Sequence, residues 1–110
     1  MEIRFANSKL AKQCNSAKKL RGDYGPKMAD KIAQRLGELR AADTLEVMRS
    51  LPGNCHELTQ NLKGRLAVDL VQPDRLCFRP DHDPVPTNAG GGLDWRLVTK
   101  IEIVGIGNYH

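Results

Sequence analysis

The sequence predicts an α+β fold for residues 1–110, in which helices pack on one face of an antiparallel or mixed sheet and form a single domain. In the first half of the chain, apolar residues recur at steps of three and four, the spacing of one face of an α-helix. In the second half they alternate with polar residues, the period of a half-buried strand. A length of 110 residues suits one domain with one modest core.

A strand and a helical hairpin are predicted at the start of the chain. Residues 2–5 alternate charged and apolar side chains, as a short strand does. Asn7 or Ser8 suits the N-cap of a following helix, and Pro26 suits the first turn of a second helix. The two helices are expected to pack antiparallel. Their predicted buried residues are Leu10, Cys14, Ala17 and Leu20 in the first helix and Met28, Ile32, Leu36 and Leu39 in the second.

A short third helix is predicted to open near residue 43. Asp43 and Glu46 have the spacing of a capping box, in which each side chain satisfies a free backbone N–H of the first turn. Leu45 and Met48 would then turn toward the core. The residues 51–54 that follow contain proline and glycine, which end the helix.

A hairpin and a last strand are predicted in the second half of the chain. Residues 66–70 alternate, with Ala67 among the outward-facing positions, and residues 72–74 form the turn. Residues 75–79 form the returning strand, with Leu76 and Phe78 on one face and Cys77 on the other. Residues 80–94 hold three prolines and three consecutive glycines, which predicts a mobile surface loop. The apolar residues 100–106 form the last strand of the sheet.

The charge distribution indicates a partner that carries negative charge. The net charge is +4, and residues 8–21 contain no acidic residue. A basic helix of this kind suits a polyphosphate or an acidic protein, and the alternative is a solvated face without a partner. The basic residues of the segment are Lys9, Lys12, Lys18, Lys19 and Arg21.

The cysteines and the apolar segments argue against several classes of protein. The chain has three cysteines without paired spacing, which favours free thiols in a reducing cytoplasm and argues against a zinc site. His82 lies between Asp81 and Asp83, but the proline-rich surroundings make a metal site there a poor prediction. We expect no cofactor, no signal peptide and no membrane span.

A small set of acid/base and cationic residues is what nuclease chemistry without metal requires. Arg75 and Arg79 share a strand face and suit phosphate binding, although ion pairs with Asp69 or Asp74 explain them equally well. Tyr109 and His110 follow the last strand, and His56 precedes the hairpin. Each has a structural alternative: an aromatic that closes the core, a frayed terminal residue and a solvated loop histidine.

The three segments that carry these residues resemble motifs of a known family. Asn54-Cys-His-Glu-Leu58 resembles a His-x-Leu segment, Asp74-Arg-Leu-Cys-Phe78 a Trp-Arg-Ile-x-Phe strand, and the last eight residues a closing Asp-Tyr-His. In this order they resemble the RelE superfamily of bacterial toxins, particularly its HigB branch. The order of elements resembles the family over the whole chain, whereas the motifs occupy the second half.

The resemblance implies an endoribonuclease that cuts messenger RNA in the ribosomal A site and is silenced by a helix-turn-helix antitoxin. The implied reaction is attack of a ribose 2′-hydroxyl on the neighbouring phosphate. In it, Arg75 stabilises the transition state, His56 and His110 transfer protons, and Tyr109 orients or stacks on the RNA. The toxin itself is expected to be a monomer. The residues expected to bind messenger or ribosomal RNA are Lys63, Arg65, Arg79, Lys12 and Lys19.

The sequence also departs from the family pattern. Asn108 stands where the family has an acidic residue, and Thr59 and Gln60 stand where it often has Lys-Gly. Two other functions therefore stay open: a ParE-like inhibitor that binds DNA gyrase, and a basic RNA-binding protein without toxicity.

Overall fold

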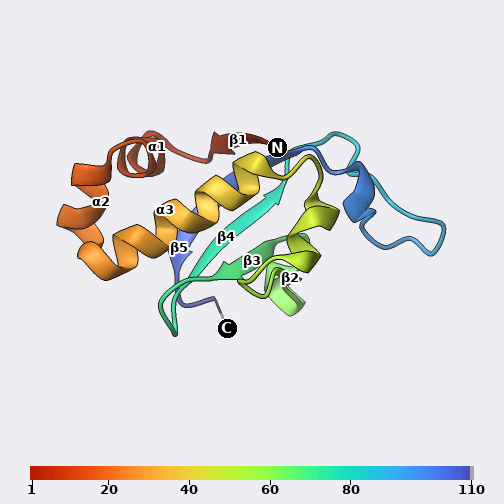
Figure 1. Ribbon diagram of the computed structural model, residues 1–110. Helices are drawn as coiled ribbons and strands as arrows, with labels where there is room; N and C mark the ends of the chain where they lie inside the picture. The colour runs from red at the N-terminus through yellow and green to blue at the C-terminus, as the bar shows by residue number, and fades with distance from the viewer. Residues whose placement is uncertain (110) are drawn as a thin grey trace.

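Among residues 1–109, which the computed structural model describes, five strands form one mixed sheet with helices packed on it (Figure 1). The strands are β1 (Glu2–Phe5), β2 (His56–Glu57), β3 (Leu66–Asp69), β4 (Arg75–Pro80) and β5 (Lys100–Gly107). Their order across the sheet is β1-β5-β4-β3-β2. β5 is parallel to β1, and the other neighbours are antiparallel. The predicted α+β class and the mixed sheet are confirmed.

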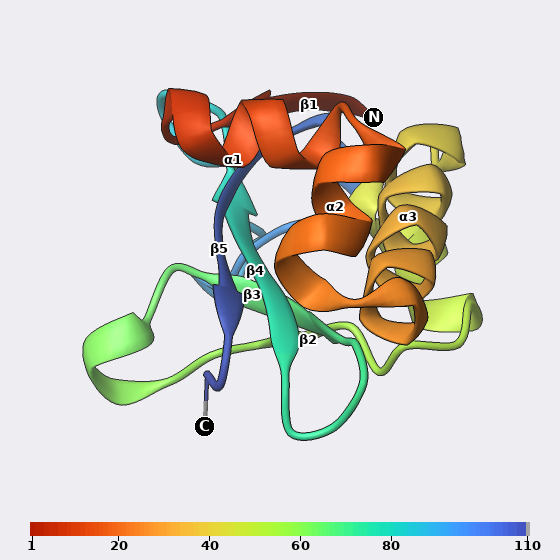
Figure 2. The ribbon, with the colours of Figure 1, turned by 90° about the vertical axis from the view of Figure 1, so that its left-hand side faces the viewer.

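Three α-helices of the described chain form the second layer: α1 (Ser8–Cys14), α2 (Ala17–Tyr24) and α3 (Pro26–Ala41). Figure 2 shows α2 and α3 on one side of the sheet, the segment 58–65 on the other side, and α1 across the end near β1. Short 3-10 helices lie in the connections: η1 (Leu45–Ser50), η2 (Gln60–Leu62) and η3 (Trp95–Leu97). None of the helices in residues 1–109 has the length and apolar character needed to cross a bilayer.

The predicted first helix is two helices in the structure. Asn7 caps α1, because its Oδ1 accepts from the Leu10 N–H at 2.9 Å. Ser16 caps α2 in the same way, because its Oγ accepts from the Lys19 N–H at 3.1 Å. The second cap restarts the helix in a new direction and leaves Ala17 exposed, so the prediction that Ala17 is buried was wrong.

The helix α3 supplies most of the helical core and one buried charge. Met28, Ile32, Leu36 and Leu39 are buried on it, as predicted. Arg35 is also buried, and its Nε donates to the carbonyl of Asp69 at 2.8 Å. Its Nη1 donates to Glu38 at 2.9 Å and to the carbonyl of Pro52 at 3.2 Å. This one side chain therefore fastens α3 to β3 and to the segment before β2.

The predicted third helix is the 3-10 helix η1, and its predicted cap is wrong. Thr44 occupies the N-cap without a side-chain hydrogen bond. Glu46 pairs instead with Arg49, at 2.9 Å between Oε2 and Nε. Leu45 and Met48 are buried, as predicted, so the inward pattern held although the helix type differed.

The sheet is covered on both faces, whereas the sequence predicts a half-buried sheet. The main core lies between the helices and the sheet and includes Leu76 and Phe78. On the other face, Leu58, Ala67 and Cys77 form a second buried cluster. The segment after β2 folds across this face, which is why Ala67 is fully buried and not outward as predicted.

The segment 80–94 has internal structure, and its mobility stays a prediction. Thr87 and Leu93 form an antiparallel bridge, and the Asn88 side chain accepts from the N–H groups of Gly90 and Gly92 at 3.0 and 3.1 Å. His82 accepts through Nε2 from the backbone at Thr99, at 3.1 Å. In residues 1–109 no cluster of side chains suited to a metal ion is found.

Candidate active site

The strand register brings the candidate residues to one face of the sheet. Residues paired across an antiparallel ladder point to the same side. One row of such partners runs through His56, Ala67, Cys77 and Gly105. The neighbouring row contains Asp69, Arg75 and Gly107. Both rows face away from the helices, because Ala67 and Cys77 belong to the second cluster.

His56 lies in β2 and not in a loop, which corrects the expectation from the sequence. Its Nδ1 is 2.6 Å from the carbonyl oxygen of Asn54. A carbonyl can only accept, so Nδ1 carries the proton. Its Nε2 is 3.3 Å from Nη1 of Arg75, which can only donate. In this arrangement the electron pair of Nε2 faces the site and accepts from the Arg75 guanidinium.

Arg75 connects the three other groups of the site. Its Nη1 donates to the backbone carbonyl of Tyr109 at 3.0 Å and lies next to His56. Its Nε is 3.3 Å from Oδ1 of Asp69, a contact that is electrostatic without hydrogen-bond alignment. The side chain is 16% exposed, so the guanidinium is held in place but still reaches solvent.

Tyr109 turns back over the end of β5. Its ring packs against the cluster of Leu58, Ala67 and Cys77. A Cβ at Gly105 would overlap the phenol oxygen, so Gly105 leaves the space that the ring occupies. Burial raises the pKa of Tyr109 above its ordinary value, the nearby Cys77 adds to the rise, and Arg65 opposes it. The phenol therefore stays protonated near neutral pH and is a hydrogen-bond donor.

These groups line an open cavity of about 280 Å³. Gln60 contributes to its wall with a positive φ of 56°, and Asn54 beside the cavity has a φ of 52°. Both backbones are in the left-handed region, which polar residues tolerate better than branched ones. The cavity is lined by His56, Glu57, Leu58, Thr59, Gln60, Asn61, Leu62, Arg75 and Tyr109. The lining is mostly polar, as a site for a charged substrate requires.

The other predicted site residues lie elsewhere. Arg79 donates from Nε to Oε1 of Glu102 at 2.8 Å, which is an ion pair with a different acid from those expected. Lys12 and Lys19 are exposed on α1 and α2 in the helical layer. Lys63 and Arg65 line a second cavity. The predicted proton-transfer residue His110 lies outside the described residues.

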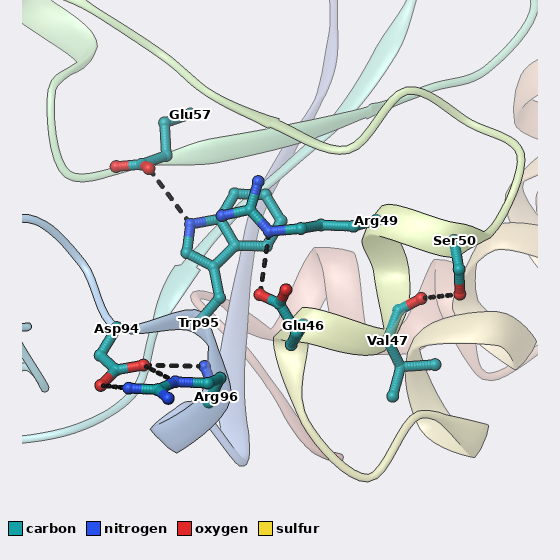
Figure 3. Close-up of polar contacts among 8 residues, drawn as sticks. All are labelled: Glu46, Val47, Arg49, Ser50, Glu57, Asp94, Trp95 and Arg96. Atoms are coloured by element: carbon teal, nitrogen blue, oxygen red, sulfur yellow. Dashed lines mark hydrogen bonds and ion pairs between the residues drawn. The ribbon is translucent and has the colours of Figure 1, made fainter.

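A group of residues missed by the sequence analysis fixes β2 (Figure 3). The indole N–H of Trp95 donates to Oε2 of Glu57 at 3.1 Å. The guanidinium of Arg49 lies 3.8 Å from the centroid of the Trp95 ring, a cation–π geometry. Glu57 is the neighbour of His56, so this group positions the strand that carries the histidine. The chain has one tryptophan, and that was the available sequence signal.

The thiols near the site are poor nucleophiles. Burial raises the pKa of Cys55 to about 12, with a smaller opposing effect of Arg49. Burial also raises the pKa of Cys77, and Arg65 opposes that rise. Both thiols are protonated at neutral pH, and the thiolate is the reactive form. Acid/base and electrostatic chemistry therefore suits this site better than covalent chemistry on sulfur.

The comparisons with known proteins agree on the fold. No family model and no curated protein sequence matches the chain. The YoeB-YefM complex from Staphylococcus aureus matches with a TM-score of 0.56 and 18% identity, over 100% of this chain and 97% of that chain. The YoeB/ParE toxin from Agrobacterium tumefaciens matches with a TM-score of 0.58 and 11% identity, over 100% of both chains. The chain therefore shares its fold with these two proteins.

Proposed function

We propose that the chain is the toxin of a toxin–antitoxin pair and that it cleaves messenger RNA in the A site of the ribosome. The supporting observation is one cavity lined by an imidazole whose Nε2 accepts from a guanidinium and by a protonated phenol, contributed by His56, Arg75 and Tyr109. These are the types of group that cleavage at a ribose 2′-hydroxyl needs. The three motifs in the second half of the chain favour the HigB branch for the same function.

In the proposed reaction the 2′-oxygen attacks the adjacent phosphorus. His56 Nε2 takes the proton of the 2′-hydroxyl, a bond forms between the 2′-oxygen and phosphorus, and the bond to the 5′-oxygen breaks. The products are a 2′,3′-cyclic phosphate and a 5′-hydroxyl, whose proton comes from a general acid. His110 is the candidate for that acid, and Tyr109 orients the RNA.

Arg75 is the proposed stabiliser of the charged intermediate. The pentacoordinate phosphorane carries more negative charge than the substrate, and a guanidinium matches two of its oxygens at once. A phosphate that enters the cavity would accept from Arg75 Nη1 in place of His56 Nε2. Nε2 is then free to accept the proton of the 2′-hydroxyl. Asp69 and the Tyr109 carbonyl keep the guanidinium oriented meanwhile.

The proposed contacts to messenger or ribosomal RNA are the five cations Lys12, Lys19, Lys63, Arg65 and Arg79, since phosphate contacts give affinity without sequence choice. The proposed protein partner is an antitoxin with a helix-turn-helix domain and an acidic surface. One similar solved structure is a YoeB-YefM complex, which supports a protein partner for this chain. We propose that the toxin is a monomer whose higher assembly depends on the antitoxin.

The test is primer extension on a defined message in a purified translation mixture, with and without ribosomes. We expect cuts that require ribosomes, and Arg75→Ala should reduce them by about 10²–10³-fold. Arg4→Ala is the matched control, since Arg4 is 72% exposed and contacts Asp81 at 3.5 Å. Equal cleavage by both variants would overturn the assignment of Arg75.

A gyrase inhibitor that acts by binding is the second candidate, because one similar structure is named a YoeB/ParE toxin. This function needs no acid/base cavity. Intact message in both mixtures, together with inhibition of DNA supercoiling by gyrase, would support it over the nuclease. Intact message without gyrase inhibition would favour a basic RNA-binding protein.

A further inference from the structure

A second cavity of about 360 Å³ lies between the segment after β2 and the segment 80–94. Its apolar lining comes from Leu66, Pro80, Val85 and Leu93. Leu66 and Pro80 are buried, whereas Val85 is 45% exposed. The cations Lys63 and Arg65 stand in the same wall and are both exposed. One carboxylate, that of Glu57, also lines the cavity, and its Oε2 accepts from Trp95. An apolar lining in which two cations outnumber one acid suits a ligand that has an apolar body and a negative charge.

The two cavities adjoin each other. Glu57 lines both of them, and the segment 57–66 provides one wall of each. Arg65 lines the second cavity and acts electrostatically on Tyr109 in the first. Its positive charge is thus shared by both cavities. An extended polymer that runs from the first cavity into the second would pass the guanidinium of Arg65.

The walls of the second cavity are held by hydrogen bonds. The indole N–H of Trp95, which is 3% exposed, donates to the Glu57 carboxylate and holds it in place (Figure 3). In the segment 80–94, the Asn88 side chain accepts from the N–H groups of Gly90 and Gly92, and Gly92 lines the cavity. A site with walls fixed before binding loses less conformational entropy when it takes a ligand.

We propose that the second cavity is a nucleotide site, which holds the sugar and base of a nucleotide next to the cleaved phosphodiester. Lys63 and Arg65 bind the phosphate between that nucleotide and the one in the first cavity. Each nucleotide of an RNA strand carries one phosphate, so a strand that passes from one cavity to the next needs positive charge at their boundary. The inference rests on the proposed function and adds the substrate contact made by the segment 80–94.

An acidic peptide also has an apolar body and negative charge. The sharing of Glu57 and of the segment 57–66 by the two cavities favours the nucleotide, because adjoining cavities serve a substrate that occupies both. The peptide remains a distinct outcome of the test.

The test measures KM and kcat for cleavage of message on programmed ribosomes by two valine variants. Val85→Asp adds a negative charge to the lining of the second cavity and should raise KM about tenfold, because its repulsion of the phosphate is costly, while kcat changes little. Val47→Asp is the matched control, since Val47 is 40% exposed but lines neither cavity. Both valines are exposed, so both variants should unfold at the temperature of the wild type.

A second pair of variants tests the cations. Lys63→Ala should raise KM and reduce the slope of log KM against log salt by about 0.7, the value for one lost contact to a single strand. Lys27→Ala, an exposed lysine on α3, should change neither. This pair gives the answer even if Val85→Asp fails to fold.

Each result decides between the possibilities. Equal KM for Val85→Asp and Val47→Asp, or equal salt slopes for the two lysine variants, would overturn the nucleotide site and leave the proposed function intact. Normal cleavage by Val85→Asp with loss of the antitoxin complex would assign the cavity to an acidic peptide. Absence of cleavage by the wild type would overturn the proposed function and this inference together.

Discussion

The ring of Tyr109 occupies the space that a side chain at position 105 would fill. Gly105 lies in the same row of the sheet as His56, Ala67 and Cys77. Because glycine has no Cβ, the phenol of Tyr109 packs directly against the backbone there. The tyrosine therefore belongs to the site because a glycine lies beneath it. This relationship gives a direct test of whether the position of Tyr109 matters for cleavage.

Gly105→Ala should displace the ring and reduce cleavage strongly, because the new Cβ would overlap the phenol oxygen. Messenger cleavage on ribosomes measures the loss, and the near-ultraviolet circular dichroism of the tyrosine reports the displacement. Gly37→Ala is the control, since nothing lies within 4 Å of a Cβ there. In the helix α3 that change should stabilise by up to about 1 kcal/mol and leave cleavage unchanged. Full activity of Gly105→Ala would show that the ring position is unimportant.

Arg35→Met should lower the free energy of unfolding by about 3 kcal/mol, because a buried guanidinium and its three hydrogen bonds are lost together. Urea titration measures the change. Arg40→Met on the same helix replaces an exposed arginine and should stay within about 0.5 kcal/mol of the wild type. Similar values for the two variants would contradict the fastening role of Arg35.

Trp95→Phe should keep a ring beneath Arg49 and remove the N–H that Glu57 accepts. The expected cost is about 1 kcal/mol of stability, the value of one hydrogen bond. Because Glu57 adjoins His56 in β2, kcat for cleavage should fall more than KM changes. Chemical denaturation and initial rates measure the two effects. A stability loss with unchanged kcat would make Trp95 a structural residue without influence on the histidine.

Cys55 should make the protein less stable in alkaline solution. Burial raises its pKa from 9.0 to about 12, so the unfolded chain loses the thiol proton first as pH rises. The stabilisation is complete below pH 9.0, and it is lost as pH rises from there toward about 12. Cys55→Ala should make the slope of unfolding free energy against pH less negative, by up to about 1.4 kcal/mol per unit. Equal slopes for variant and wild type between these pH values would contradict the protonation of this half-buried thiol.

The periodic segments could be predicted from the sequence, and the reason is local. Ile32, Leu36 and Leu39 fall on one helical face, and Leu76 and Phe78 on one strand face, so residue spacing alone places them in the core. Arg35 escaped prediction although it lies three residues after Ile32 on the same face. Its charge predicts a solvent-exposed side chain, and the carbonyl groups that bind it belong to segments far along the chain.

The missed features depend on contacts between segments far apart in the chain. Cys14 and Leu20 continue one apolar stripe, so the spacing of apolar residues predicts one helix. It gives no sign of the N-cap at Ser16 that separates α1 from α2. Ala67 is buried because the segment after β2 crosses its face, and no local pattern predicts that crossing. The strand β2 has two residues, too few for a recognisable alternation.

The candidate site was predicted in part. The motifs pointed to His56, Arg75 and Tyr109, and the structure places these three around one cavity. Their chemical roles stay proposals. The pairing of Arg79 with Glu102 and the contact of Trp95 with Glu57 join residues 23 and 38 positions apart, so neither could be predicted from neighbouring sequence.

The parallel pairing of β1 with β5 has a consequence for the time course of folding. Glu2 is the register partner of Lys100, and β5 lies between β1 and β4 in the sheet. Among the strands of residues 1–109, β1 is made first, and it has no neighbour until β5 has also left the ribosome. The pairing of β1 with β5 closes a loop that contains most of the chain, and closing a long loop is slow. The helices should therefore form before the sheet is complete. During this interval the apolar faces of the helices are not yet covered by the sheet. A chaperone that binds apolar helices could therefore bind the folding chain.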